Sequence, residues 1–260
     1  MHVELPPPYA SSSASDQAPS TSTAPYAQPP PLPRQNHLSI KRASGQLKGT
    51  WIIDPELKLP EAVLAPLQPN EVRKNLELVS DFGAINAEVW IVRKDRSRES
   101  EEYGGGKTEN VWPATVTVMG KNGAVKVRMN ADESHPFKLV VTSNFGKVTI
   151  GLPRTFVGPL TATTRFGSLC LSGSVKPQVA TFSDVNNTFK GFLGDVESTG
   201  FGNGDWEGSR VEVDCLNGSV NIYYLDELDE HNAAKKNQPG FWARMFGKDT
   251  QPSPDVASVR

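Results

Sequence analysis

The amino-acid sequence predicts an all-β fold, a short β-helix-like solenoid in which strand–corner–strand units, called rungs here, stack on one another. Three observations lead to this prediction: a recurring pattern centred on glycine, alternating apolar residues on both sides of it, and glycine spacings close to the length of one rung. Hydrophobic residues make up 37% of the 260 residues, and 22 glycines and 21 prolines favour turns over long helices.

The pattern occurs five times, each time on a glycine that follows Phe or Asn. The copies are Phe82-Gly83, Asn122-Gly123, Phe145-Gly146, Phe166-Gly167 and Asn217-Gly218. The residues seven and five positions before each glycine, and two, four and six positions after it, are apolar in every copy except for Gly173. Because side chains alternate between the two faces of a strand, this period of two predicts two strands that share one buried face.

Two architectures fit such a pattern, a solenoid and an antiparallel β-sandwich. A two-residue hairpin turn needs positive φ at both central residues, which disfavours it for the Phe-Gly copies, whereas a type II corner needs positive φ only at the glycine. The middle glycines are 23 and 21 residues apart, the interval of 40 shortens once an insert is set aside, and the interval of 51 fits two rungs, one of them degenerate. The sequence therefore favours the solenoid, and the antiparallel sandwich is the alternative.

Composition divides the chain into three parts. Residues 1–36 form an arm rich in Pro, Ser and Ala, which we expect to be disordered because it has too little apolar surface to offset its ordering entropy. Residues 38–230 carry the β-repeat domain, interrupted by a charged insert at 94–106 that we expect to be mobile. Residues 231–260 form a linker with a short amphipathic segment at 240–247, which we expect to dock on the domain rather than on a partner or a membrane.

The ends of a solenoid need caps, because end rungs expose apolar faces and unpaired strand edges. Gly49–Pro55 reads as a strand that ends at proline, and the apolar Leu59–Leu67 follows it, so we assign both to an amino-terminal cap. Four acids near the other end lack calcium-loop spacing and are expected to be solvated linker charges. They are Asp226, Glu227, Asp229 and Glu230.

Five segments resemble a known protein family. They are Lys48–Pro60, Arg73–Val92, Gly151–Ser172, Thr181–Val185 and Trp206–Glu227. Across about Leu38–Glu227 the chain is similar to an uncharacterised family of basidiomycete fungal proteins that carry a domain of unknown function, numbered 7330. Members usually have Asn or Ser before the repeat glycine, where three copies here have Phe. The repeat is also distantly similar to bacterial adhesin-like domains with a β-helical fold, and neither resemblance assigns an activity.

No pattern of residues in the sequence indicates catalysis, a metal or a cofactor. The four histidines lie in different regions without metal-ligand spacing, and neither a Gly-x-Ser-x-Gly elbow nor a phosphate-binding Gly-x-x-x-x-Gly-Lys loop occurs. The outward positions of adjacent rungs do not stack carboxylates, as a polysaccharide-cleaving solenoid would need. The net charge of −2 gives no global attraction to nucleic acid or to an anionic membrane. We therefore predict a protein that is not an enzyme.

Two segments could bind a partner or a ligand. In the arm, one motif matches Pro-Pro-x-Tyr and the other Pro-Pro-Leu-Pro, both ligands of WW domains such as those of a class of ubiquitin ligases, although composition alone can also produce such matches. Their residues are Pro6, Pro7, Tyr9, Pro30, Pro31, Leu32 and Pro33. The glycine-rich loop at 200–208 places Phe201, Asp205 and Trp206 where they could contact a ligand, and the alternative is that Trp206 folds back over the last rung.

The two cysteines and the amino terminus bear on location. Cys170 and Cys215 fall on opposite faces of the predicted strands, so we expect free thiols and a reducing compartment. The first residues do not resemble a signal peptide, and no apolar stretch is long enough for a transmembrane helix. These features predict a cytoplasmic protein.

Three functions follow as hypotheses. The first is a non-enzymatic β-repeat scaffold or protein-interaction module with a WW-ligand arm. The alternative is an adhesin-like or polysaccharide-binding surface module, and the third is a polysaccharide-active β-helix enzyme.

Overall fold

The computed structural model describes residues 28–64, 66–67, 72–93, 113–132, 134–202 and 204–230. Contacts divide the chain into a unit that ends at Pro30 and a unit that begins at Pro31, and the fold below is that of the second unit. The insert at 94–106 and the amphipathic segment at 240–247 lie outside the described residues.

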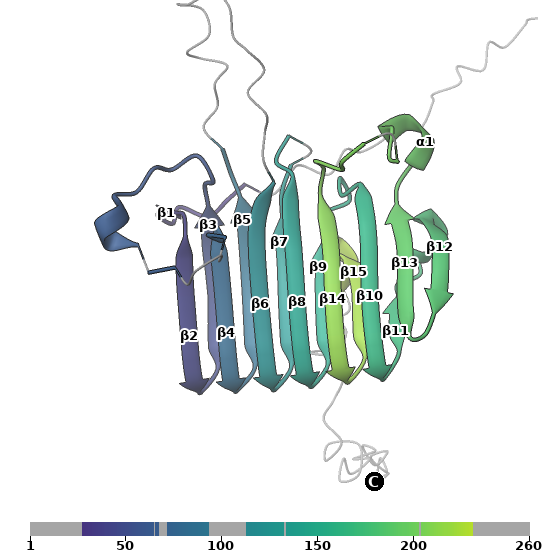
Figure 1. Cartoon of the computed structure of the whole chain (residues 1–260), viewed down its shortest axis with the longest axis horizontal. Helices are drawn as coiled ribbons and strands as arrows, with labels where there is room; N and C mark the ends of the chain where they lie inside the picture. Colours follow the sequence, from purple (N-terminus) through teal and green to yellow (C-terminus); the bar gives the residue numbers. More distant parts are fainter. Residues whose placement is uncertain are drawn as a thin grey trace, which may run out of the picture. The chain divides into compact units, whose positions relative to one another are not determined.

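Two sheets make up this unit (Figure 1). The eight-stranded sheet has the order β12 (Val179–Val185), β13 (Thr188–Leu193), β10 (Gly158–Phe166), β14 (Arg210–Asn217), β8 (Phe137–Phe145), β6 (Ala114–Asn122), β4 (Leu76–Phe82), β2 (Leu38–Ser44). The seven-stranded sheet has the order β1 (Arg34–Gln35), β3 (Leu47–Ile53), β5 (Ile85–Ile91), β7 (Val125–Asn130), β9 (Val148–Leu152), β15 (Val220–Tyr224), β11 (Leu169–Leu171). Short helical elements are η1 (Glu61–Val63), η3 (Lys176–Gln178) and α1 (Val196–Thr199).

Each rung places one strand in each sheet and joins them at a corner. The rungs are β2–β3, β4–β5, β6–β7, β8–β9, β10–β11 and β14–β15, and neighbouring rungs pair in parallel in both sheets. The all-β prediction is confirmed. The parallel pairing of the rungs differs from the antiparallel sandwich that is the alternative prediction. Antiparallel pairing occurs where β13 joins β10 and β12.

Apolar residues of the five predicted copies fill the space between the sheets. Val127 and Ile150 are paired in register on β7 and β9, and both are completely buried. The residues five and seven positions before each corner glycine are buried in all five copies, as the period of two predicts. Hydrophobic burial along this interior is the main favourable term that the fold offers against chain entropy.

A sixth copy of the pattern, centred on Gly45, was missed in the sequence. Its strands are β2 and β3, so Gly49–Ile53, the larger part of the first predicted cap segment Gly49–Pro55, belongs to the second strand of the first rung. Leu38 and Ile40 before Gly45, and Leu47 and Trp51 after it, keep the apolar spacing and could have identified the copy.

The rungs do not stack in chain order. The rung formed last along the chain, β14–β15, lies between β8–β9 and β10–β11, and Figure 1 shows β14 flanked by β8 and β10. The interval of 51 residues therefore holds no degenerate rung, contrary to the prediction. It holds β12 and β13, joined by a two-residue turn in which Asn186 and Asn187 have φ of 52° and 60°. Positive φ at both central residues is the type I′ geometry that suits a hairpin.

The six corner glycines form a column. A Cβ atom on Gly83, Gly123, Gly146 or Gly218 would lie between 2.1 and 2.5 Å from the carbonyl oxygen of the neighbouring corner glycine. These four have φ between 139° and 148°, positive as predicted but far from the value of about 80° in a type II turn, and Gly167 does not have positive φ. A Cβ on Gly167 would still lie 1.9 Å from the Gly218 carbonyl oxygen, so the close approach of stacked backbones requires glycine there too.

A helical turn at residues 225–230 follows β15 and packs on the outer face of the seven-stranded sheet. Leu228 is only 1% exposed, and a Cβ on Gly151 of β9 would lie 2.9 Å from its Cδ2 atom. Asp229 accepts hydrogen bonds from Arg128, and Glu227 accepts one from the Ser172 hydroxyl at 2.6 Å. The prediction of solvated linker charges is therefore wrong for Glu227 and Asp229, because their contacts anchor the turn to the sheet.

Candidate functional site

Clustered reactive side chains are scarce among the described residues. Among the described residues, no group of three or more His, Cys, Asp or Glu side chains could hold a metal ion, and no helix is long and apolar enough to span a bilayer. Cys170 is exposed and Cys215 is buried, and both are free thiols, as predicted. Three places remain as candidates: an ionic pocket beside β2, an aromatic cluster beside β13, and the row of rung corners.

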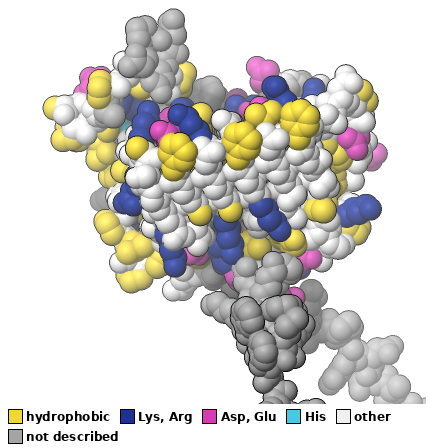
Figure 2. Space-filling model, turned by 90° about the horizontal axis from the view of Figure 1, so that it is seen from below, with side chains coloured by type: hydrophobic (Ala, Val, Ile, Leu, Met, Phe, Trp, Pro, Cys, Tyr) yellow, Lys and Arg dark blue, Asp and Glu magenta, His cyan; other side chains and the backbone are white. Residues whose placement is uncertain are grey.

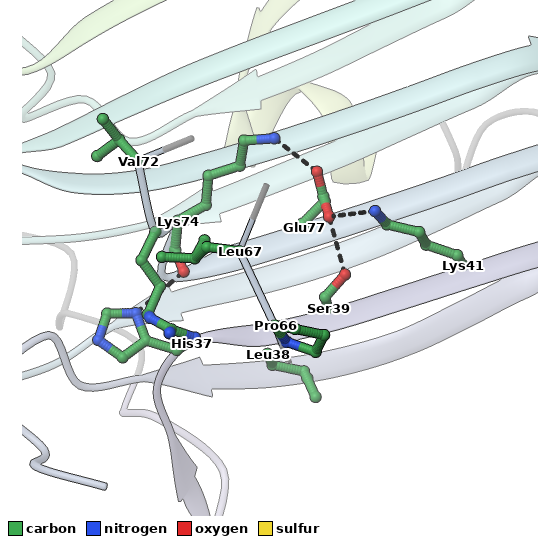
Figure 3. Close-up of a pocket in the computed structure, with 10 residues that line it drawn as sticks. His37, Leu38, Ser39, Lys41, Pro66, Leu67, Val72, Lys74 and Glu77 are labelled. Carbon is green, nitrogen blue, oxygen red and sulfur yellow. Dashed lines mark hydrogen bonds and ion pairs between the residues drawn. The ribbon is translucent and has the colours of Figure 1, made fainter. Parts of the chain in front are cut away.

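The ionic pocket surrounds the carboxylate of Glu77 (Figure 3). It has a volume of about 60 Å³, and Glu77, on β4, is only 8% exposed. Lys74 and Lys41 approach its two carboxylate oxygens at 2.5 and 3.1 Å, and the Ser39 hydroxyl donates a hydrogen bond at 2.8 Å. His37 lies at the edge, with its Nδ1 atom 3.1 Å from the Lys74 carbonyl oxygen.

These contacts fix the protonation of Glu77. Burial raises the pKa of its carboxyl, but hydrogen bonds from Lys74, Ser39 and Lys41 outweigh burial and lower the pKa to about 2. A carboxylate held ionised by three donors is a poor general acid near neutral pH. The arrangement ties β2 to β4 and to the chain before β4, so we interpret it as a structural ionic cluster.

The predicted ligand loop folds onto its own aromatic residues. The Phe201 ring lies 4.8 Å from Phe192 of β13 and 5.5 Å from Trp206, measured between centroids, and it stacks on Phe182 of β12 at 6.1 Å. The Trp206 indole N–H donates to the Ser209 carbonyl at 2.9 Å. The two aromatic residues are thus packed against one another and against β12 and β13 rather than projecting, while Asp205 is exposed.

The predicted WW-domain motifs are placed only in part. Pro6, Pro7 and Tyr9 lie outside the described residues, whereas the Pro30 motif ends next to the first strand, and Leu32 within it is exposed.

The predicted arm is shorter than residues 1–36. Arg34 and Gln35 form β1, which pairs with β3, and the Asn36 amide donates to the carbonyls of Pro55 and Leu57. The backbone pairing of this segment is therefore part of the β unit.

The corner row carries exposed phenylalanines that no functional prediction had included. In spatial order the residues before the corner glycines are Ser44, Phe82, Asn122, Phe145, Asn217 and Phe166. Phe82, Phe145 and Phe166 are 65%, 54% and 72% exposed. Figure 2 shows hydrophobic side chains in a row across this end of the rungs. The strand period did not predict this exposure, because it places the residue before each glycine on the same side as the buried residues five and seven positions before it.

Basic side chains surround the row. Within three residues of the six corner glycines, six residues are basic and only Asp81 is acidic. The basic residues are Arg42, Lys48, Lys121, Lys126, Lys147 and Arg165. Asp81 lies 2.9 Å from the Lys121 ammonium, so one cation offsets its charge. We call this end of the rungs, with its phenylalanines and basic residues, the corner face.

Comparison with known proteins identifies the family. No curated protein matches the sequence. A solved structure of a protein described as a "putative cell adhesion protein", from Clostridium sporogenes, is similar at 14% sequence identity and a TM-score of 0.32, covering 70% of this chain and 89% of that chain. The model of a family described as a domain of unknown function (DUF7330) matches residues 36–227, which is most of the β unit. The chain therefore belongs to the DUF7330 family.

Proposed function

We propose that the protein is a non-enzymatic binding scaffold, in which a rigid β-solenoid body presents the corner face and a proline-rich arm recruits WW-domain proteins. The observation that carries the proposal is the exposure of three phenylalanines at the rung corners. The equivalent corner position in other rungs holds a polar residue. The parallel stacking of rungs supports the solenoid description. The apolar interior between the sheets supports a role for outer surfaces rather than for an internal cavity.

The corners themselves provide an internal control for the role of phenylalanine. Asn122 and Asn217 occupy the same position as Phe82, Phe145 and Phe166 in neighbouring rungs, with the same backbone pairing. The stack therefore does not need a large apolar side chain there. An exposed aromatic ring gains little from folding, and rows of exposed apolar groups on a folded protein mark interaction sites.

The experiment uses a variant that carries Phe82→Asn, Phe145→Asn and Phe166→Asn. We expect its midpoint of thermal unfolding to stay within about 2 °C of the original, because surface changes of this kind cost little. Proximity labelling in cells with the full-length protein should then show a reduced set of neighbours for this variant. Met119→Asn, which removes an exposed apolar side chain from an outer sheet face, is the control and should keep the full set. A large drop in the unfolding midpoint, or an unchanged set of neighbours, would contradict the role of the corner face.

The arm is proposed to bind WW domains through Pro6, Pro7 and Tyr9. Polyproline II is already populated in such a segment, so docking in an aromatic groove orders little additional backbone. A dissociation constant of tens of micromolar, about −6 kcal/mol, is the expected range for transient recruitment. Titrating the full-length protein against a WW domain, with Tyr9→Ala as the comparison, tests the arm independently of the corner face. Equal affinity of both proteins would remove the arm from the proposal.

A cytoplasmic location belongs to the same proposal, because the WW-domain ubiquitin ligases that the arm would recruit act there. Cell fractionation of the native protein checks it. Recovery outside the cell would instead favour the surface-module hypothesis.

A further inference from the structure

We propose that the corner face is a peripheral docking surface for an anionic lipid bilayer. The inference deepens the proposed function, since it names what the exposed phenylalanines contact. It rests on the flatness of the face, the spacing of its aromatic residues, and its local charge.

Hydrogen bonds hold successive corners in register, and Figure 1 shows the corner ends of β2, β4, β6, β8, β14 and β10 at a similar level. The N–H groups of Gly45, Gly83, Gly123 and Gly146 donate to the carbonyl of the residue before the next corner glycine, at 2.8 to 3.0 Å. A second row of bonds, from Leu47, Ile85, Val125, Val148 and Val220, joins the other side of each corner at 2.9 Å. Residues at the same position in each corner therefore project to the same height.

The phenylalanines are spread along this face rather than clustered. They lie on every second strand from β4 to β10, which places neighbouring rings about 10 Å apart and the outer two about 19 Å apart at the usual strand spacing. Rings this far apart cannot cover one another, in contrast to the packed cluster around Phe201. A single small ligand could not contact all three, whereas an extended planar surface could.

The local charge of the face is opposite to that of the whole chain. Six basic residues and one acid lie near the corner glycines, although the chain as a whole has a formal net charge of −2. Figure 2 shows Lys and Arg side chains on both borders of the hydrophobic row. Arg42, Lys48, Lys121, Lys147 and Arg165 are exposed. Aromatic groups that enter the headgroup region, beside cations that attract anionic lipids, are the two features that hold a protein at a membrane surface.

A protein ligand fits the same face less well. Peptide recognition by a rigid domain uses a groove or a free strand edge. The two hollows that the structure shows near the first rung are the ionic pocket and an adjoining hollow of about 370 Å³ lined by Leu38, Leu57 and Leu64, and neither contains a corner residue. A flat face with projecting rings matches a deformable lipid surface, so the bilayer is the occupant that we propose.

Vesicle sedimentation with the full-length protein tests the inference. The protein should sediment with vesicles of equal parts phosphatidylcholine and phosphatidylserine, and much less with phosphatidylcholine alone. The triple variant Phe82→Asn, Phe145→Asn, Phe166→Asn and the double variant Lys147→Glu, Arg165→Glu should each weaken binding by about tenfold or more, and added salt should weaken the binding of the original protein.

Matched controls separate the corner face from general charge and hydrophobicity. Lys58→Glu with Lys190→Glu makes the same change in net charge at two exposed residues away from the corners, and Val63→Asn removes a side chain that is 70% exposed at the end of η1. Both should bind vesicles as the original protein does. A chain that ends at residue 238 should also keep binding, which excludes the amphipathic segment at 240–247 as the source.

Three results would overturn the inference: no sedimentation with anionic vesicles, equal loss in the controls, or loss only on truncation at residue 238. They can be told apart from failure of the proposed function. If vesicle binding is absent while the triple variant still loses neighbours in proximity labelling, the corner face binds a protein and the scaffold proposal stands. If the triple variant is strongly destabilised, the phenylalanines are structural and both proposals fail.

Discussion

Glycine occupies five of the six corners because each of these leaves no room for a side chain against the neighbouring corner, and Gly45 at the first corner has φ of 93°. At Gly146 the nearest obstacle is the carbonyl oxygen of Gly123, 2.3 Å from where a Cβ would lie, and the backbone has φ of 139°. Both the space and the backbone conformation exclude other residues. The phenylalanine beside it is free to vary, since its side chain points away from the column.

Replacing Gly146 with alanine should therefore lower the free energy of unfolding by about 2 to 4 kcal/mol, from the strained φ and the displaced carbonyl. Gly173→Ala is the matched control, because a Cβ there meets nothing within 4 Å and φ is not positive. It should change stability by less than about 0.5 kcal/mol. Urea denaturation measures both, and similar values for the two would show that the corner contacts are not rigid.

Glu77 is a second residue whose surroundings predict a measurable effect. Its folded-state pKa of about 2 lies below the ordinary value of 4.5, so its interactions stabilise the fold above pH 4.5 and are lost as the pH falls toward 2. The difference corresponds to an upper value of about 3 kcal/mol.

Unfolding free energies measured across that pH range should therefore fall more steeply for the original protein than for Glu77→Gln. Glu212→Gln removes a carboxylate that pairs with Lys138 at the surface and should leave the slope unchanged. Identical slopes for the original protein and Glu77→Gln would mean that the carboxylate is not held as the contacts indicate.

At the scale of elements, the period of two was sufficient to identify most strands and their buried faces. It requires only local information, since side chains of a strand alternate whatever its neighbours are. β11 is the weakest case, because it has three residues and its apolar positions are only half buried. The β12–β13 hairpin lay outside the repeat, and its signal was the Asn186-Asn187 turn. The period of two places the phenylalanine before each corner glycine on the buried side, so only the structure shows that Phe82, Phe145 and Phe166 are exposed and form one row.

The helical turn after β15 is the element that sequence analysis described least well. In sequence its acids resemble those of a solvated linker. Only the structure shows that Arg128, Arg154 and Ser172 donate hydrogen bonds to them. The hydrogen bond from Arg128 lowers the pKa of the Asp229 carboxyl, which keeps that acid ionised well below neutral pH. Partners so distant in sequence cannot be inferred from composition.

Leu228→Ala should accordingly lower the free energy of unfolding by about 2 to 3 kcal/mol, because the leucine is buried against β9. Asp226→Asn in the same turn breaks an ion pair with Arg154 that is more than half exposed on both sides, and it should cost less than about 1 kcal/mol. Chemical denaturation distinguishes the two. A negligible cost for Leu228→Ala would mean that the turn does not hold to the sheet in solution.

For the whole molecule, the order of the rungs is the feature that the sequence did not predict. Glycine spacing measures distance along the chain. It identifies neighbouring rungs correctly only when rungs that follow one another in the sequence also stack on one another. Here β10–β11 leaves a space beside β8–β9 that β14–β15 later fills. Pairing partners of β10 are therefore β13 and β14, both of which follow it in the chain.

A chain that ends at residue 209 tests this order. If rungs were stacked in chain order, such a truncation would remove only the end of the stack and leave β10 paired to β8. With β14–β15 between them, we expect the amide groups of β10 and β13 to lose protection from hydrogen exchange, while β4 and β6 keep most of theirs. Protection of β10 equal to that in the full-length protein would contradict the interleaved order.

The interleaved rung also has a consequence for biosynthesis. As the chain emerges from the ribosome, the first four rungs can assemble one after another, each on the edge left by the one before. Residues of β10 to β13 must then wait without their final neighbour until β14 and β15 have been translated. During that interval the open edges of β8 and β9 are exposed to other nascent chains and to chaperones. We therefore expect the incomplete stack to be most open to misassembly in the interval before β14 and β15 are translated.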